Sequence, residues 1–344
     1  MTRAIDIRTD VTDAVGIGRH VETVATVYIG EDVAEPAVVC FAWPGGGYGR
    51  HYFDFDMPDS GGGGQAGWHT RRGWIFVAVD TVNSGDSTHP DGVALTYEHL
   101  TAANDATVRA ISRQLVEGTI ADGVRAIVDP TTIGLGQSLG GSLAVLTQGQ
   151  YGTFDAIAVL GFSGHHTKTW APPSMAVGRR TYIPRGTNLA ELTPDVFVSA
   201  MPEMAFDDNA MPLCAPGFHH QAEPAEIVAA DMIDYPARRG ELPVWASRTI
   251  PACAVTMMSP GAIASEAACV EVPVFVGVGE RDTVPAPLSE PTAYPNSRDI
   301  TVFVCEGMAH MHNFGGTRFR LWSRIHGWGE AVHAQRRESA ELQS

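Results

Sequence analysis

A strand–turn–helix pattern built around one serine constrains this chain more than any other feature. Residues 131–141 read TTIGLGQSLGG, an apolar run that ends in Gly136-Gln137-Ser138-Leu139-Gly140, and the helical pattern SLAVLTQ follows. This is a G-x-S-x-G sequence in the context that it requires, a sharp turn between a strand and a helix. The glycines keep side chains out of the crossing, and the helix N-terminus places N–H groups where an oxyanion would form. Ser138 is therefore a candidate nucleophile.

A glycine-rich turn after a strand can also bind a phosphate group, so a dinucleotide site is the first alternative. The G-x-G-x-x-G fingerprint fails, because counting from Gly134 puts Leu139 in the sixth position and the glycine one residue later. The acidic residue expected about 20 positions on is also missing, since Asp155 precedes a strand instead of ending one. We therefore expect no cofactor.

Buried-strand patterns alternate with helical patterns from residue 37 to residue 163, and this rhythm predicts βαβ units and a doubly wound, mostly parallel sheet. His20–Ile29 alternates and indicates an earlier, partly exposed strand. Apolar runs indicate buried strands at 37–43, 74–79, 131–137, 156–160, 273–279 and 300–304. Helical patterns cover 101–127, 142–148 and 316–336.

The segment 165–270 breaks this rhythm with many prolines and scattered methionines and aromatic residues. About 100 residues are too many for a structureless loop in a compact domain. We interpret the segment as an inserted, largely helical cap over a core formed by 1–164 and 271–344. Its large apolar side chains either form the cap's own small core or line a pocket. The candidate substrate-binding residues are Met204, Phe206, Trp245 and Met257 of this segment, with Tyr48 and Gln137 from the core.

Polar residues that follow two later strands are candidate partners for Ser138. A serine needs a base to accept its proton, and the base needs a third group to orient it. Asp282 and His310 each follow a predicted strand, and such loops emerge at one edge of a parallel sheet. Glu280 remains an alternative to Asp282, and His312 an alternative to His310.

Three consecutive glycines follow the predicted strand 37–43, in the sequence Pro44-Gly45-Gly46-Gly47-Tyr48. Glycines at this point let backbone N–H groups approach a ligand closely. The loop is either an oxyanion loop or a flexible turn.

Together these segments resemble the α/β-hydrolase-fold serine hydrolases over nearly the whole chain. The matching pieces are WPGGGYG, DTVNSGDS, GQSLGG, GVGERDTVP and EGMAHMHNF, with the catalytic residues in the order Ser…Asp…His. The resemblance implies that Ser138 attacks a carbonyl carbon, that His310 takes the proton and later returns it, and that Asp282 orients the imidazole. It also implies oxyanion donors at Leu139, Gly46 and Gly47. Trp43-Pro44 stands where a family member of the HGGG type has its histidine, so the donating glycine stays open.

The resemblance implies hydrolysis of a carboxylic ester or lactone through an acyl-enzyme. A serine at the turn disfavours the dehalogenase and epoxide hydrolase branches, which use aspartate there. The methionine-rich cap favours a medium-sized hydrophobic or aromatic substrate, and a bulky macrolactone such as zearalenone would suit a covered pocket. Acyl transfer on the same fold and a non-catalytic ligand-binding protein are the alternatives.

Composition excludes several other classes. The net charge of −16 argues against nucleic acid and anionic membranes as partners. The sequence has no 18-residue apolar run and no apolar segment near residue 1, so we expect no transmembrane helix and no secretory signal. The five cysteines form no C-x-x-C pair, which suits buried thiols in a reducing cytoplasm. The histidine pairs at 165–166 and 219–220 lack ligand spacing, so we expect no metal. The oligomeric state stays open, including a homo-oligomer.

Overall fold

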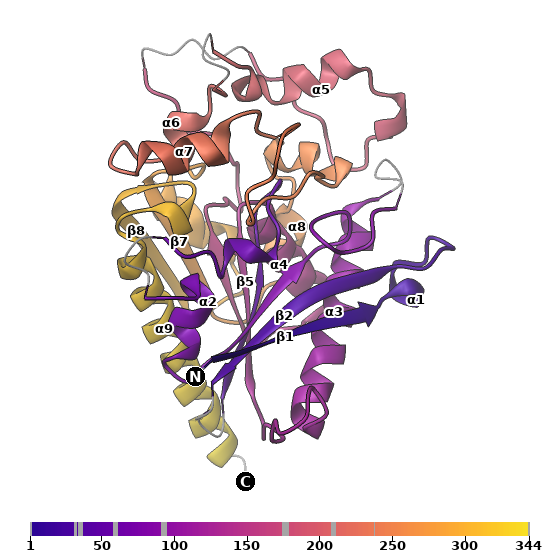
Figure 1. Cartoon of the computed structure of the whole chain (residues 1–344), viewed down its shortest axis with the longest axis vertical. Helices are drawn as coiled ribbons and strands as arrows, with labels where there is room; N and C mark the ends of the chain where they lie inside the picture. Colours follow the sequence, from indigo (N-terminus) through magenta and orange to yellow (C-terminus); the bar gives the residue numbers. More distant parts are fainter. Residues whose placement is uncertain are drawn as a thin grey trace.

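The computed structural model describes residues 2–30, 33, 37–57, 61–90, 95–173, 179–207, 211–236 and 238–342. In these ranges eight strands form one sheet with the order β1-β2-β4-β3-β5-β6-β7-β8 (Figure 1). Neighbours from β4 to β8 pair in parallel, whereas β2 pairs antiparallel with β1 and β4. The strands are β1 (Thr2–Asp10), β2 (Glu22–Gly30), β3 (Val38–Trp43), β4 (Ile75–Asp80), β5 (Thr131–Gln137), β6 (Ala156–Leu160), β7 (Val274–Arg281) and β8 (Ile300–Ala309).

Helices cover both faces of this sheet. Side chains alternate along a strand, so β3 directs Val39 and Phe41 to one face and Cys40 and Ala42 to the other. The first face packs against α3 (Tyr97–Glu117) and α4 (Leu139–Tyr151), with α1 (Thr12–Val15) beside α3. The second packs against α2 (Gly64–Thr70) and α9 (Arg318–Glu341). The predicted doubly wound, mostly parallel sheet is therefore confirmed.

One helix has different bounds from the sequence prediction, and one strand was not predicted, each for a local reason. The long helix predicted over 101–127 is α3, which begins at Tyr97 behind a capping box of Thr96 and His99 and ends where Gly118 adopts a left-handed φ of 68°. Strand β1 was not predicted at all. Most of its side chains are exposed, and the apolar alternation in its sequence is confined to Ile5 and Ile7, which is too short to mark a half-buried strand by itself.

The chain between β6 and β7 runs across the carboxyl edge of the parallel strands, where Figure 1 shows α5, α6 and α7 above β5. In the described residues its regular elements are short helices joined by irregular stretches. They are η3 (Leu189–Glu191), α5 (Pro194–Ala200), η4 (Pro202–Met204), α6 (Ala215–Phe218), α7 (Ala225–Met232), η5 (Ala252–Met258) and α8 (Ala264–Ala268). The last of these, α8, packs against α4 with Ala267 in the core. The end of the segment 165–270 therefore belongs to the helical layer beside the sheet.

Three short 3-10 helices complete the described elements: η1 (Arg50–Tyr52), η6 (Pro287–Ala293) and η7 (His312–Phe314). Among the helices of the described ranges, none combines the length and apolarity that crossing a membrane requires.

Candidate active site

Ser138 occupies a strained turn between β5 and α4. Its φ of 54° and ψ of −117° lie outside the usual regions for a residue with a side chain, at a cost of about 1–3 kcal/mol. The turn is held from both sides. The Ser138 N–H donates to Leu160 O at 2.8 Å, and its carbonyl accepts from Ser142 N at 3.1 Å. The side chain is consequently lifted above the end of the sheet.

The two glycines of the turn are required by close backbone approach. A Cβ at Gly136 would lie 2.0 Å from Gly140 O, and a Cβ at Gly140 would lie 2.1 Å from Trp43 O. Both distances are far below any contact between non-bonded atoms, and in each case the obstacle is backbone that cannot rotate away. The G-x-S-x-G spacing is therefore a steric requirement of this fold as well as a sequence pattern.

Asp282 and His310 are the first residues after β7 and β8, and they meet above the sheet. His310 Nδ1 lies 2.6 Å from Asp282 Oδ1, and both side chains are buried. Because a carboxylate only accepts, the bond places a proton on Nδ1 and leaves Nε2 of the neutral imidazole as an acceptor. The carboxylate also accepts from Gly279 N and Thr283 N, each at 2.7 Å.

These contacts keep Asp282 ionised. Burial alone raises its pKa, but His312, His310 and their hydrogen bonds outweigh that effect and hold the pKa well below its ordinary value. A permanently charged carboxylate both orients the imidazole and stabilises its protonated form.

The structure distinguishes the alternatives that the sequence left open. Glu280 is exposed within β7 and accepts a hydrogen bond from Gly307 N at 2.9 Å, away from the histidines. His312 donates from Nε2 to Asp282 Oδ2 at 2.7 Å but does not line the cavity that contains Ser138. His310 does line it. The geometry thus places His310, and not His312, on the cavity that contains Ser138, and both histidines contact the Asp282 carboxylate.

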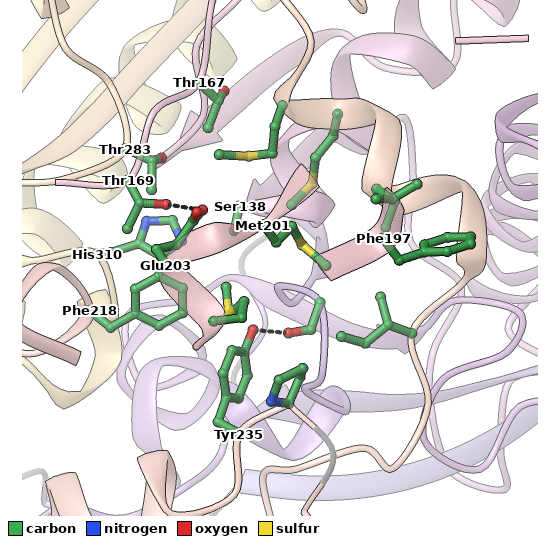
Figure 2. A pocket seen from close by; sticks show the side chains of 18 of the residues that line it. Ser138, Thr167, Thr169, Phe197, Met201, Glu203, Phe218, Tyr235, Thr283 and His310 are labelled. Carbon is green, nitrogen blue, oxygen red and sulfur yellow. Dashed lines mark hydrogen bonds between the residues drawn. The ribbon is translucent and has the colours of Figure 1, made fainter. Parts of the chain in front are cut away.

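Ser138 and His310 face one cavity (Figure 2). The Ser138 side chain is half-buried, and within the described residues its hydroxyl forms no hydrogen bond. The hydroxyl can therefore rotate toward the imidazole, and such contacts commonly tighten only when a substrate is bound.

The glycine loop after β3 lies directly against this turn. A Cβ at Gly45 would lie 3.2 Å from Ser138 Cβ, and one at Gly46 would lie 3.7 Å from Leu139 Cδ2. Gly46 lines the cavity, and Gly47 has a φ of 83° that favours glycine. Leu139 is the first residue of α4, where the N–H has no acceptor inside the helix. Gly46 and Leu139 therefore lie beside the turn of Ser138, and Gly47 follows Gly46 in the same loop.

Side chains from the segment between β6 and β7 hold the carbonyl groups of the glycine loop. Tyr235 donates its hydroxyl to Gly46 O at 2.9 Å (Figure 2), and Arg238 donates to Gly47 O. Since N–H and C=O point in opposite directions across a trans peptide, tying the Gly46 carbonyl fixes the direction of the Gly47 N–H.

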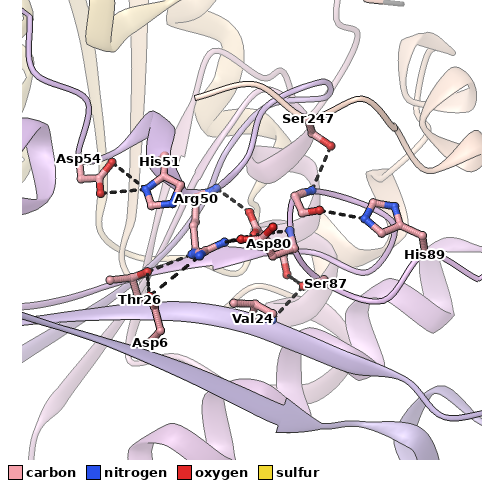
Figure 3. Close-up of polar contacts among 12 residues, drawn as sticks. Asp6, Val24, Thr26, Arg50, His51, Asp54, Asp80, Ser87, His89 and Ser247 are labelled. Carbon is pink, nitrogen blue, oxygen red and sulfur yellow. Dashed lines mark hydrogen bonds and ion pairs between the residues drawn. The ribbon is translucent and has the colours of Figure 1, made fainter. Parts of the chain in front are cut away.

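The chain directly after the glycine loop is bound to the core through Arg50. Arg50 donates from its backbone N–H and its guanidinium to the buried carboxylate of Asp80, at 2.6 Å each, and also to Asp86 at 2.7 Å (Figure 3). Asp80 is the last residue of β4, so the loop is connected to the end of a central strand.

The Asp231 carboxylate, in α7, accepts hydrogen bonds from three residues of the segment between β6 and β7 and from one core residue, Tyr48. Its carboxylate is fully buried and accepts from His219, at 2.9 Å, and from Arg238, at 3.0 Å. Burial lowers the pKa of His219, but Asp231 and Glu223 more than compensate and raise it to about 9. Two further donors, Tyr48 Oη and Trp245 Nε1, approach the same carboxylate at 2.7 Å each.

The cavity holds about 870 Å³ of unfilled space, including its opening to solvent, and its lining is mainly apolar. Met204 and Met257, both expected to bind substrate, line it. The structure does not bring the other four expected residues to it. Tyr48 and Trp245 bond to Asp231 instead, and Phe206 is half-exposed. Gln137 donates from its amide nitrogen to His310 O at 2.9 Å, and the same nitrogen lies 3.4 Å from His310 Nε2.

Several lining residues had no signal in the sequence. Phe197 and Met201 belong to or follow a short helix, and Tyr235 and Ile250 lie in irregular stretches, so no periodicity marks the face that they present. Within the ranges that the structure describes, no group of three or more His, Cys, Asp or Glu side chains is arranged to hold a metal ion.

No family model matches this chain, and no curated protein matches its sequence. Solved structures match it over nearly their full length. A thermophilic esterase from Thermogutta terrifontis superposes with a TM-score of 0.59 at 12% identity, covering 95% of this chain and 99% of that one. A haloalkane dehalogenase loop variant from Bradyrhizobium elkanii gives 0.58 at 12%, covering 98% and 100%. A lipase in its open form gives 0.56 at 16%, covering 96% and 99%. At these identities the likeness establishes the fold alone.

Proposed function

Because the chain has the α/β-hydrolase fold, we propose that it is a serine hydrolase that cleaves a carboxylic ester or lactone through an acyl-enzyme. The observation that carries the proposal is the strained turn of Ser138, whose side chain shares a cavity with His310 while Asp282 holds the far side of that imidazole at 2.6 Å. A nucleophile, a base and a group that orients the base are the minimum set for this chemistry.

The proposed reaction begins when Ser138 Oγ attacks the carbonyl carbon and His310 Nε2 accepts the hydroxyl proton. The negative charge that develops on the carbonyl oxygen is stabilised by the N–H groups of Leu139 and of Gly46 or Gly47. His310 then donates the proton to the leaving alcohol oxygen as the carbon–oxygen bond breaks. A water molecule, deprotonated by the same imidazole, releases the acid and restores the serine.

The shape of the cavity supports a medium-sized hydrophobic substrate. Its lining is mainly apolar, and the methionines at 201, 204, 257 and 258 can adapt to irregular shapes. An apolar lining suits a bulky lactone as well as a linear ester; a macrolactone of the zearalenone type is one such substrate. The segment 165–270 acts as the cap that supplies most of this lining.

We further propose a cytoplasmic protein that acts on a small molecule and not on nucleic acid or membranes. All five cysteines are unpaired, and four of them are buried, as expected in a reducing compartment. The net charge of −16 disfavours polyanionic partners.

The test is labelling with a fluorophosphonate probe, which reacts with activated serines. The wild-type protein should be labelled and Ser138→Ala should not. The matched control is Ser142→Ala, one turn further along α4, because that hydroxyl only donates to Leu139 O at 2.7 Å. Both variants are then assayed on p-nitrophenyl esters of increasing chain length and on a panel of lactones that includes a macrolactone. Labelling or turnover that survives in Ser138→Ala would disprove the proposal.

A further inference from the structure

One acidic side chain stands in the otherwise apolar lining of the cavity. Glu203 belongs to η4, its side chain is only 3% exposed, and it lines the same cavity as Ser138 and His310. Figure 2 shows it reaching into the cavity from the side on which these two residues lie. A buried carboxylate needs compensation for its charge and partners for both oxygens.

The two oxygens of Glu203 differ in what they contact. Oε1 accepts from Thr169 Oγ1 at 2.9 Å and from Arg180 at 2.6 Å. Oε2 is buried and has no hydrogen-bond partner among the described residues. Because buried polar atoms in folded proteins are usually paired, an unpaired oxygen on a residue that lines the cavity leaves room for a donor from the bound molecule.

The charge around Glu203 indicates which kind of donor fits. The guanidinium of Arg180 is mostly buried and already neutralises the carboxylate. A second cation at Oε2 would be close to Arg180 without an anion of its own. A neutral hydroxyl group, in contrast, supplies one hydrogen bond and adds no charge.

We propose that Glu203 determines specificity by accepting a hydrogen bond at Oε2 from a hydroxyl group of the substrate. The preferred substrate is then a hydrophobic ester or lactone that carries an alcohol or phenol group at a defined distance from its scissile carbonyl. This inference rests on the proposed function, because the cavity is a substrate cavity only if Ser138 is the nucleophile.

The experiment compares p-nitrophenyl esters of 6- to 10-hydroxyalkanoic acids with the unsubstituted esters of the same chain length. For each pair, the ratio of kcat/KM values isolates the contribution of the hydroxyl group. The wild type should favour the hydroxylated ester by about 10- to 100-fold at one chain length, the range expected for a hydrogen bond to a charged acceptor. Esters of the matching ω-amino acids form the second arm, which tests for a cationic donor.

Glu203→Gln should reduce the best ratio to about 2- to 10-fold, because the amide keeps an oxygen for Arg180 but replaces the charged acceptor with an N–H group that can only donate to the hydroxyl oxygen, and a neutral hydrogen bond is weaker. Thr169→Val is the matched control: it removes a contact of Oε1 and leaves Oε2 in place, so the hydroxyl preference should persist. Glu203→Asp, which keeps the charge but withdraws it by one methylene, should shift the preference to a longer chain and serves if the glutamine variant does not fold.

The outcomes separate the two proposals. Unsubstituted esters that are hydrolysed through Ser138 with no hydroxyl preference at any length would overturn the role of Glu203 alone. A preference that survives undiminished in Glu203→Gln would do the same, as would a larger preference for the amino esters. An absence of both ester turnover and Ser138 labelling would overturn both proposals.

Discussion

Replacing Asp231 with Asn tests how much one buried carboxylate contributes to the stability of the fold. The substitution preserves the shape of the side chain but removes its charge. Asp231 is fully buried, and its carboxylate accepts from Tyr48, His219, Arg238 and Trp245. An asparagine offers one acceptor oxygen and an NH₂ group, so part of this donor set would face another donor.

The expected loss in the free energy of unfolding follows from the charges that the substitution leaves unpaired. Breaking a buried ion pair by removing one partner costs about 3–5 kcal/mol, because the remaining charge is desolvated without compensation. Here the Arg238 guanidinium is 3% exposed and depends on Asp231 for its counter-ion. Arg238 also donates to Gly47 O, so a displaced guanidinium should loosen the glycine loop and lower kcat as well.

The measurement is the free energy of unfolding from urea titration, with the m-value checked for two-state behaviour. Tyr48→Phe is the matched control, since it removes one neutral donor at 2.7 Å and leaves the carboxylate in place. It should lose only about 1.5–3 kcal/mol. A loss below about 1 kcal/mol for Asp231→Asn would refute the reasoning, because it would mean that the buried cations need no counter-charge.

Three further predictions concern the site and its surroundings. Gly136→Ala should abolish fluorophosphonate labelling, because the new Cβ would lie 2.0 Å from a backbone oxygen; normal labelling would contradict the steric account of the turn. Asp282→Asn should lower kcat by about 10⁴-fold on a p-nitrophenyl ester, since the amide cannot hold the His310 tautomer, and a loss below tenfold would count against the assignment. The free energy of unfolding should fall as the pH rises from 6.5 through about 9, which is the raised pKa of His219. A group with a raised pKa stabilises the fold only while it is protonated. Urea unfolding of the wild type and of His219→Gln across this range should therefore show a steeper decline in the wild type.

Local patterns were sufficient for the sheet and for the strand ends that carry the site. The apolar runs of β3 to β7 are buried on both faces, so each is continuous and easy to recognise. Strand β8 lies at the edge of the sheet and is only partly buried over 300–304, yet its sequence is also an apolar run. Ser138, Asp282 and His310 are the first residues after three of these strands, and parallel strands place such residues at one edge. Strand β1 lacked that signal because most of its side chains face water.

The irregular segment between β6 and β7 could not be interpreted in the same way. Tyr48 and Trp245 are large aromatic residues of the kind that often line pockets, yet both donate hydrogen bonds to Asp231. Asp231 is far from Tyr48 along the chain. Met204 lines the cavity whereas Phe206, two residues later, is half-exposed. Short helices and turns carry no periodicity from which to deduce the face that each residue presents.

The sequence by itself determined which residues follow which strands. A continuous apolar run and the sterics of a tight turn are both set by residues that are neighbours along the chain. Only the tertiary structure decided that His310 and not His312 faces the cavity, and that Glu203 leaves one carboxylate oxygen unpaired in its wall. Such outcomes depend on contacts between segments that are far apart along the chain. Thr169 and Glu203 are more than 30 residues apart, and Tyr235 and Gly46 are farther apart still. Long-range pairing of this kind is set by packing, and no local pattern encodes it.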